Sequence, residues 1–113
     1  TRRILEYLKE NNVEINTLIG VGGISQKSPF VMQMLADVTG RTIEVSGSSQ
    51  SCAFGSVIHA ATVAGLYTSV TEAQQALCAP TIRTYIPDPS KSTHFELRYS
   101  KYLALSEFSE ELF

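Results

Sequence analysis

The sequence of 113 residues has no tryptophan, two cysteines, four prolines and no excess of basic residues. Nine lysines and arginines against eleven acidic residues give a net charge of −2, so nothing attracts the chain to nucleic acid or to an anionic membrane. No apolar run approaches the ~20 residues of a membrane-spanning helix, and we see no secretory signal. We therefore expect a cytoplasmic protein with neither nucleic acid nor membrane as a partner.

Metal ligands and catalytic sets are also scarce. Cys52 and Cys78 have no metal-ligand spacing and lie in apolar helical segments, so we expect them to be reduced thiols in the core. His59 lies in one of these segments and is expected to be a buried, hydrogen-bonded histidine. No Ser-His-Asp set can be built from the sequence. We therefore predict no metal site and no catalytic residue within these 113 residues.

A strand, a pair of glycines and a helix follow one another near the start of the chain. The apolar run of residues 18–21 predicts a buried strand that leads directly into Gly22 and Gly23. Ser28 and Pro29 then signal the N-terminus of a helix over residues 29–39, and Gly40 ends it. A second short strand is expected at 42–45. The pattern predicts an α/β fold with two parallel strands joined by a crossover helix.

The glycine pair is the first candidate for a functional site. Glycines without Cβ atoms beside a helix N-terminus form a receptive site for a nucleotide, although the same pair also suits a simple change of chain direction. A dinucleotide motif is suggested by Gly20-x-Gly22 and by Glu44 further along, but Ser25 replaces its third glycine. A Walker-type phosphate loop is excluded because no glycine precedes Lys27.

The remaining pattern predicts helices over residues 2–11, 52–64, 71–79 and 93–108, and an extended segment over 82–86. The helix over 52–64 is apolar on all sides, which predicts burial, with Gly55 at a close contact between helices. Such a helix needs protein on both of its sides, more than 113 residues supply. We therefore interpret residues 1–113 as one domain fragment, incomplete at its N-terminus, of a longer α/β protein.

Three stretches of the sequence are more specific than these patterns. Residues 22–29, together with the Gln-x-x-Ala-Asp-x-x-Gly ending at 33–40, resemble the C-terminal domain of the FGGY carbohydrate kinases. Residues 51–61 are similar to a helix of small residues in that family. Within the family, residues 26–30 and the Thr-Tyr-Ile-Pro-Asp-Pro segment at 84–89 most resemble the L-ribulokinase branch.

The resemblance implies a fold and an activity. The fold is the C-terminal actin/hexokinase-like (ribonuclease H-like) ATPase domain, with ATP in a cleft between two domains. The activity is transfer of the γ-phosphate of ATP, with Mg²⁺, to a sugar hydroxyl, with L-ribulose of L-arabinose catabolism as the expected sugar. ATP or ADP and the sugar are the expected ligands, and the parent enzyme is a possible homo-oligomer.

The resemblance also implies which residues meet the nucleotide. The expected adenosine-binding residues are Gly22, Gly23, Ile24, Ser25, Gln26 and Ser28. Because this loop is one residue longer than the commoner family loop, the choice among Ser25, Gln26 and Lys27 stays open.

The catalytic aspartate and the phosphate loops of this superfold lie upstream. We interpret Asp37 as a solvated or capping carboxylate and Asp88 as a loop residue without a partner, so we expect the fragment alone to be inactive. An NAD-binding dehydrogenase fragment and a non-catalytic packing or oligomerisation module are the alternatives.

Overall fold

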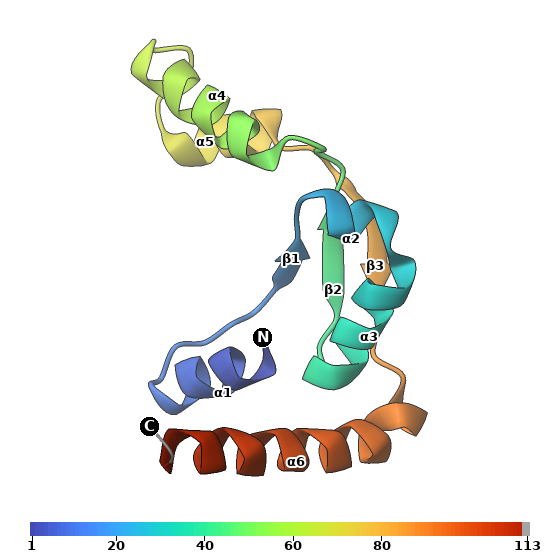
Figure 1. The fold of residues 1–113 in the computed structure, drawn as a ribbon. Helices are drawn as coiled ribbons and strands as arrows, with labels where there is room; N and C mark the ends of the chain where they lie inside the picture. The colour runs from blue at the N-terminus through green and yellow to red at the C-terminus, as the bar shows by residue number, and fades with distance from the viewer. Residues whose placement is uncertain (112–113) are drawn as a thin grey trace.

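The computed structural model describes residues 1–111 as a small sheet with helices at its two ends and against one face (Figure 1). In chain order the elements are α1 (Arg2–Glu10), β1 (Leu18–Gly20), α2 (Gly23–Lys27), α3 (Pro29–Thr39), β2 (Ile43–Ser46), α4 (Ser51–Val63), α5 (Val70–Leu77), β3 (Thr81–Tyr85), the 3-10 turn η1 (Pro89–Lys91) and α6 (Ser92–Glu111).

The sheet has the strand order β1-β2-β3. Strands β1 and β2 are parallel, with Leu18 opposite Ile43, so the predicted strand–helix–strand unit and the α/β class are confirmed. The extended segment predicted at 82–86 is strand β3, which pairs antiparallel with β2 and places Tyr85 opposite Ile43.

The core lies between the sheet and α3. Ile43 and Val45 are alternate residues of β2, so both side chains point to the same face, where they pack with Met32, Ala36 and Tyr85. Gly20 brings β1 close to this helix, because a Cβ atom at residue 20 would lie 2.7 Å from Met32 Cε. The core therefore fixes the position of α3, and with it the turn that precedes the helix.

Both ends of α3 agree with the sequence prediction. Ser28 is the N-cap, with its Oγ accepting the N–H of Val31 at 3.5 Å, and Pro29 follows at the first helical position. Gly40 ends the helix with φ at 64°, in the left-handed region.

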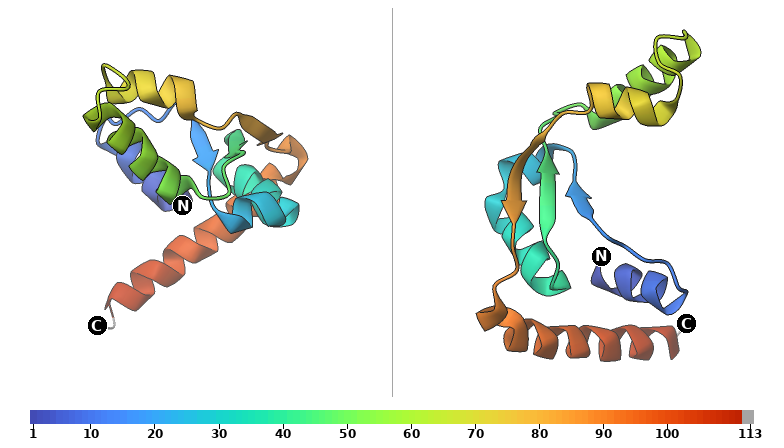
Figure 2. Two further views of the ribbon diagram at one scale, coloured as in Figure 1. Left: turned by 90° about the horizontal axis from the view of Figure 1, so that it is seen from above. Right: turned by 180° about the vertical axis from the view of Figure 1, so that it is seen from behind.

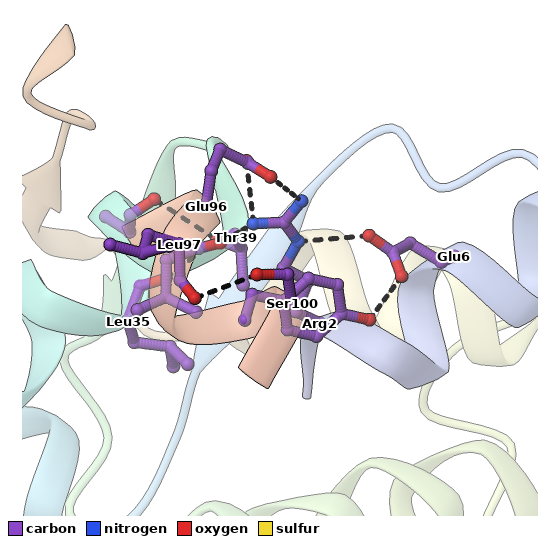
Figure 3. A network of polar contacts seen from close by, with 10 residues as sticks. Arg2, Glu6, Leu35, Thr39, Glu96, Leu97 and Ser100 are labelled. Carbon is purple, nitrogen blue, oxygen red and sulfur yellow. Dashed lines mark hydrogen bonds and ion pairs between the residues drawn. The ribbon is translucent and has the colours of Figure 1, made fainter. Parts of the chain in front are cut away.

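Helices α1 and α6 meet at the opposite end of the sheet from α4 and α5 (Figure 1), and Arg2 links them (Figure 3). The Arg2 guanidinium binds Glu96 of α6, with Nη1 2.8 Å and Nη2 3.0 Å from its two carboxylate oxygens. It also binds Glu6 at 3.0 Å and lies over the ring of Tyr99, 4.0 Å from the centroid. The Tyr99 hydroxyl of α6 also donates to Glu6 of α1. Arg2 and these partners therefore join two helices that are distant in the sequence.

Helices α4 and α5 pack against each other beyond the other end of the sheet, as Figures 1 and 2 show. The prediction that the helix over 52–64 is buried on all sides is wrong, because Ile58 and Ala61 are its buried residues while Val63 is 89% exposed. No heavy atom lies within 4 Å of a Cβ built on Gly55, so the predicted close contact is absent.

The predicted core positions of Cys52, Cys78 and His59 are also wrong, because all three residues are exposed. Cys52 and His59 lie on α4, whose buried residues are Ile58 and Ala61, and Cys78 follows α5 as its C-cap. The apolar composition of α4 shows what the helix could bury, but this chain covers only the side that carries Ile58 and Ala61.

The open arrangement is visible in the overall dimensions. The chain extends over 53 × 32 × 24 Å with a radius of gyration of 17.8 Å, whereas a compact domain of this length has about 13 Å. Its accessible surface is 8269 Å², against roughly 6,100 Å² for a compact monomer of the same mass. Within the described part of the chain, no helix combines the length and apolar character needed to cross a membrane.

Candidate functional site

The carboxyl ends of the parallel strands β1 and β2 meet at the edge of the sheet that faces α4. The turn after β1 begins at Gly22, whose φ of 84° lies in the left-handed region. No heavy atom lies within 4 Å of a Cβ built on Gly22 or on Gly23. Gly22 is therefore required for its backbone conformation, and Gly23 leaves the space beside the turn open.

The segment after Gly22 is helix α2, where the sequence predicted a loop. Ser25 is 4% exposed, and its hydroxyl donates to the carbonyl of Gly22 at 2.7 Å. This contact folds the turn back on itself and turns the Ser25 side chain into the protein. The sequence missed α2 because a helix of five residues is too short to show a periodic pattern.

Gln26 joins this turn to the loop after β2. Its amide nitrogen lies 3.1 Å from the carbonyl oxygen of Ser46 and 3.0 Å from that of Ser48. The hydroxyl of Ser46 accepts the N–H of Ser48 at 3.2 Å, and the hydroxyl of Ser51 donates to the Ser48 carbonyl at 3.3 Å. The two loops at this edge are thus held together by one side chain and a set of serines.

A cavity of about 260 Å³ opens between this edge and α4. Its apolar wall includes Ile19, Val21, Phe54 and Ile58, and its polar lining includes Ser46, Ser48 and Ser51. Ligand pockets usually measure about 300–1,000 Å³ and combine apolar walls with a few polar groups. The cavity has this mixed lining, and its volume lies just below this range.

The predicted site residues stand in different relations to this cavity. None of the six predicted residues lines it: Gly22 follows the lining residue Val21 in the chain, and Gln26 bonds the carbonyls of two lining serines. Gly23 and Ile24 form the exposed part of the turn, with Ile24 68% exposed. Ile24 and Ser25 border a second cavity of about 280 Å³ along β1, while Ser28 caps α3.

Sequence reasoning did not name the residues that α4 contributes, Phe54 and Ile58. The signal that could have found them is the serine-rich loop at 46–51, which leads from the end of β2 into α4. Loops that follow parallel strands gather at one edge of a sheet, so this loop was bound to face the glycine turn.

Asp37 is a structural carboxylate, and its interpretation as a solvated group is wrong. The residue is 7% exposed, and its Oδ1 accepts the N–H of Asp88 at 2.9 Å and the amide of Gln33 at 2.8 Å. Burial acts to raise the pKa of Asp37, but these donors and Lys91, 3.4 Å away, lower the pKa overall. Asp37 therefore ties α3 to the segment between β3 and α6.

Asp88 also has partners that the sequence did not predict. Its carboxylate accepts the hydroxyl and the N–H of Ser90 and lies 3.5 Å from Lys91 Nζ. These contacts, the Ser90 hydroxyl first, lower the pKa of Asp88. Within residues 1–111 no three His, Cys, Asp or Glu side chains are placed to hold a metal ion.

Sequence comparison identifies relatives over nearly the whole chain. The family model for the C-terminal domain of the FGGY family of carbohydrate kinases matches residues 1–64. A ribulokinase of Vibrio parahaemolyticus is 41% identical over 111 residues, covering 98% of this chain and 20% of that protein. A ribulokinase of Bacillus licheniformis is 38% identical over 109 residues, covering 93% of this chain and 20% of that protein. The chain spans about a fifth of the length of these relatives.

Two solved structures share the fold. A xylulose kinase of Lactobacillus acidophilus superposes with a TM-score of 0.69 at 23% identity, over 80% of this chain and 18% of that one. A gluconate kinase of the same organism gives a TM-score of 0.72 at 22% identity, over 86% and 19% of the two chains. With the family model matching more than half of its residues, the chain belongs to the FGGY family of carbohydrate kinases, and residues 1–64 match the family's C-terminal domain.

Proposed function

We propose that this chain forms the adenosine-binding edge of a kinase that transfers the γ-phosphate of ATP to a sugar hydroxyl, with L-ribulose as the sugar. The observation that carries the proposal is the cavity between the serine loop after β2 and α4, whose lining reaches Val21, directly before the turn at Gly22 and Gly23. Family membership supports the reaction class, and the relatives named ribulokinase support the choice of sugar.

The residues at this edge suit a purine and a ribose. Ile19, Val21 and Phe54 offer an apolar wall to the flat base, and the open space beside Gly23 lets a ribose approach the backbone. ATP with Mg²⁺ would supply the phosphoryl group, and both would be held mainly by parts of the enzyme beyond this segment.

A catalytic base is not expected from this segment. General-base catalysis needs a carboxylate within hydrogen-bond reach of the attacking hydroxyl. Asp37 is held within the α3 network, and Glu44 accepts the hydroxyl of Thr81 at 2.9 Å. We therefore propose that the 113 residues alone do not phosphorylate L-ribulose.

The two alternatives receive no comparable support. In the dinucleotide interpretation Glu44 would bind a ribose, but its carboxylate is bonded to Thr81 of the neighbouring strand. Ser25 stands where that motif needs a glycine. The family match favours the kinase over both a dehydrogenase and a packing module.

The proposal is tested in a chimera in which this chain replaces the matching fifth of the Vibrio parahaemolyticus ribulokinase. The change Gly23→Val should raise the KM for ATP about tenfold, because its branched side chain occupies the space beside the turn, a loss typical of one poorly accommodated contact. Folding should be retained, since no atom lies within 4 Å of a Cβ at this position.

The unaltered chimera and the change Ala104→Val on the exposed surface of α6 are the controls. A folded Gly23→Val chimera with an unchanged KM for ATP would contradict the proposal, and tighter binding of NAD than of ATP would favour the dehydrogenase. The isolated chain, measured in the same assay for ADP release, should show no turnover that depends on the sugar.

A further inference from the structure

The hairpin of α4 and α5 joins the sheet through two adjacent passes of the chain, residues 47–50 and 78–80, which we call the neck (Figure 1). The N–H of Gly47 donates to the carbonyl of Pro80 at 3.0 Å and so links the two passes. A Cβ on Gly47 would lie 2.9 Å from Ile82 Cγ2 and 3.0 Å from the Pro80 oxygen. The two passes therefore touch at the point where they leave the sheet.

Gln26 binds the neck from the side of the sheet. Its helix, α2, lies between β1 and α3, while its two acceptors are the last residue of β2 and the second residue of the neck. The same amide nitrogen bonds both carbonyls, at 3.1 and 3.0 Å, so it fixes the direction in which the chain leaves β2. The side chain is half-buried, which makes loss of these contacts costlier than at the surface.

The contacts of Ser48 pass this constraint on to α4. The Ser48 carbonyl, which accepts from Gln26, also accepts the hydroxyl of Ser51, the first residue of α4. The Ser48 hydroxyl accepts the N–H of Gln50 at 3.3 Å. The position of Ser48 therefore sets where α4 begins, and α4 carries Phe54 and Ile58 into the wall of the cavity.

We propose that Gln26 is a positioning residue that sets the opening of the nucleotide cavity, by holding the neck and through it α4. This inference rests on the proposed function and changes the part expected of Gln26, from a ligand of the nucleotide to a support of the wall that receives it. The glycine turn and α4 then keep a fixed separation, although they lie on different parts of the chain.

The test is the change Gln26→Glu in the chimera. A carboxylate in place of the amide faces two carbonyl oxygens and cannot donate to them, so the neck should move and the KM for ATP should rise about tenfold. The kcat and the KM for L-ribulose should stay within about twofold of the unaltered chimera, because the proposed function places only the adenosine at this edge. Gln75→Glu, the same change on the exposed surface of α5, is the matched control and should alter none of these values.

Two further measurements separate positioning from direct contact. In the 113-residue chain, Gln26→Glu should speed amide hydrogen exchange over residues 47–55 and leave α3 protected. Its effect on the KM for ATP should also shrink in a Ser46→Ala background, because both changes loosen the same loop and coupled residues are not additive. Strict additivity with unchanged exchange would overturn the inference and make Gln26 a direct ligand.

The remaining outcomes also decide between the two proposals. An unchanged KM for ATP in Gln26→Glu, with the KM raised by Gly23→Val, would overturn the inference and leave the proposed function standing. Unchanged values in both variants would overturn both. A loss of kcat, of affinity for both substrates and of α3 protection together would show a general structural role. If Gln26→Glu does not fold, the shorter amide of Gln26→Asn takes its place, with the same direction of change.

Discussion

Helices α3 and α4 have similar lengths and similarly apolar sequences, yet they differ in capping and in burial. Helix α3 has a serine cap, a left-handed glycine at its end and three buried residues, Met32, Ala36 and Asp37. Helix α4 has no side-chain cap hydrogen bond and buries Ile58 and Ala61. The first helix packs on a sheet and is held by local and distant contacts, whereas the second packs mainly on α5.

The core and the candidate site therefore lie in different parts of the molecule. The sheet body, which we define as β1, α2, α3, β2 and β3, holds the core and the network around Asp37. The hairpin, α4 with α5, carries apolar side chains that form one wall of the candidate nucleotide cavity. We expect damage to the sheet body to reduce global stability, and damage to the hairpin to change local opening and ligand affinity.

The largest change in stability is expected from Asp37→Ala, which alters a residue of the sheet body. The change removes a buried acceptor of the Asp88 N–H and the Gln33 amide and breaks the ion pair with Lys91. The free energy of unfolding should fall by about 3 kcal/mol, a cost typical of breaking a buried charged network. Urea denaturation of the chain measures it, with the partial change Asp37→Asn expected to cost less.

The same residue gives this prediction a dependence on pH. Because the pKa of Asp37 is lowered in the folded state, its contribution is present above the unfolded pKa of about 3.9 and is lost as the pH falls through the folded value. The stability difference between the original chain and Asp37→Asn should therefore narrow below about pH 4. A difference that stayed constant down to pH 2 would show that the carboxylate does not carry the effect.

The features that sequence could predict are those determined by neighbouring residues. Ser28, Pro29 and Gly40 define the ends of α3 through local backbone chemistry, and the apolar runs on both sides of this helix define β1 and β2. The position of Asp37 could not be predicted, because its partners Asp88 and Lys91 are 51 and 54 residues away.

The candidate site also has a part that local sequence determines and a part that depends on distant contacts. The glycine turn could be predicted because its conformation depends on local sequence: Gly22 has a φ of 84°, which favours glycine. The role of Gln26 in bridging two loops and the contribution of Phe54 were missed, since both depend on how the neck places α4. Burial of Cys52, Cys78 and His59 was wrongly predicted from an apolar composition, which states what a helix could bury but not what surrounds it.

An intermediate effect is expected at the boundary between the two regions, from Gly47→Ala. The new methyl group would lie within 3.0 Å of the Pro80 carbonyl oxygen and of Ile82 Cγ2, so the two passes of the neck must separate. We expect a loss of about 1–2 kcal/mol, as for a tight site forced to accept an extra methyl group. Hydrogen exchange should show faster opening of the hairpin than of α3, and equal acceleration in both would mean that the neck does not divide them.

The smallest effect, and of opposite sign, is expected from Gly55→Ala in the hairpin. A Cβ at this position meets no heavy atom within 4 Å, and alanine in a helix interior is more favourable than glycine by about 0.5–1 kcal/mol. Exchange of the α4 amides should therefore slow by a matching few-fold in the 113-residue chain, while Ala53→Gly on the same helix should speed it. Destabilisation by Gly55→Ala would mean that another surface covers α4 in solution. If that surface is a second copy of the chain, the effect will grow with protein concentration, because association stabilises by mass action.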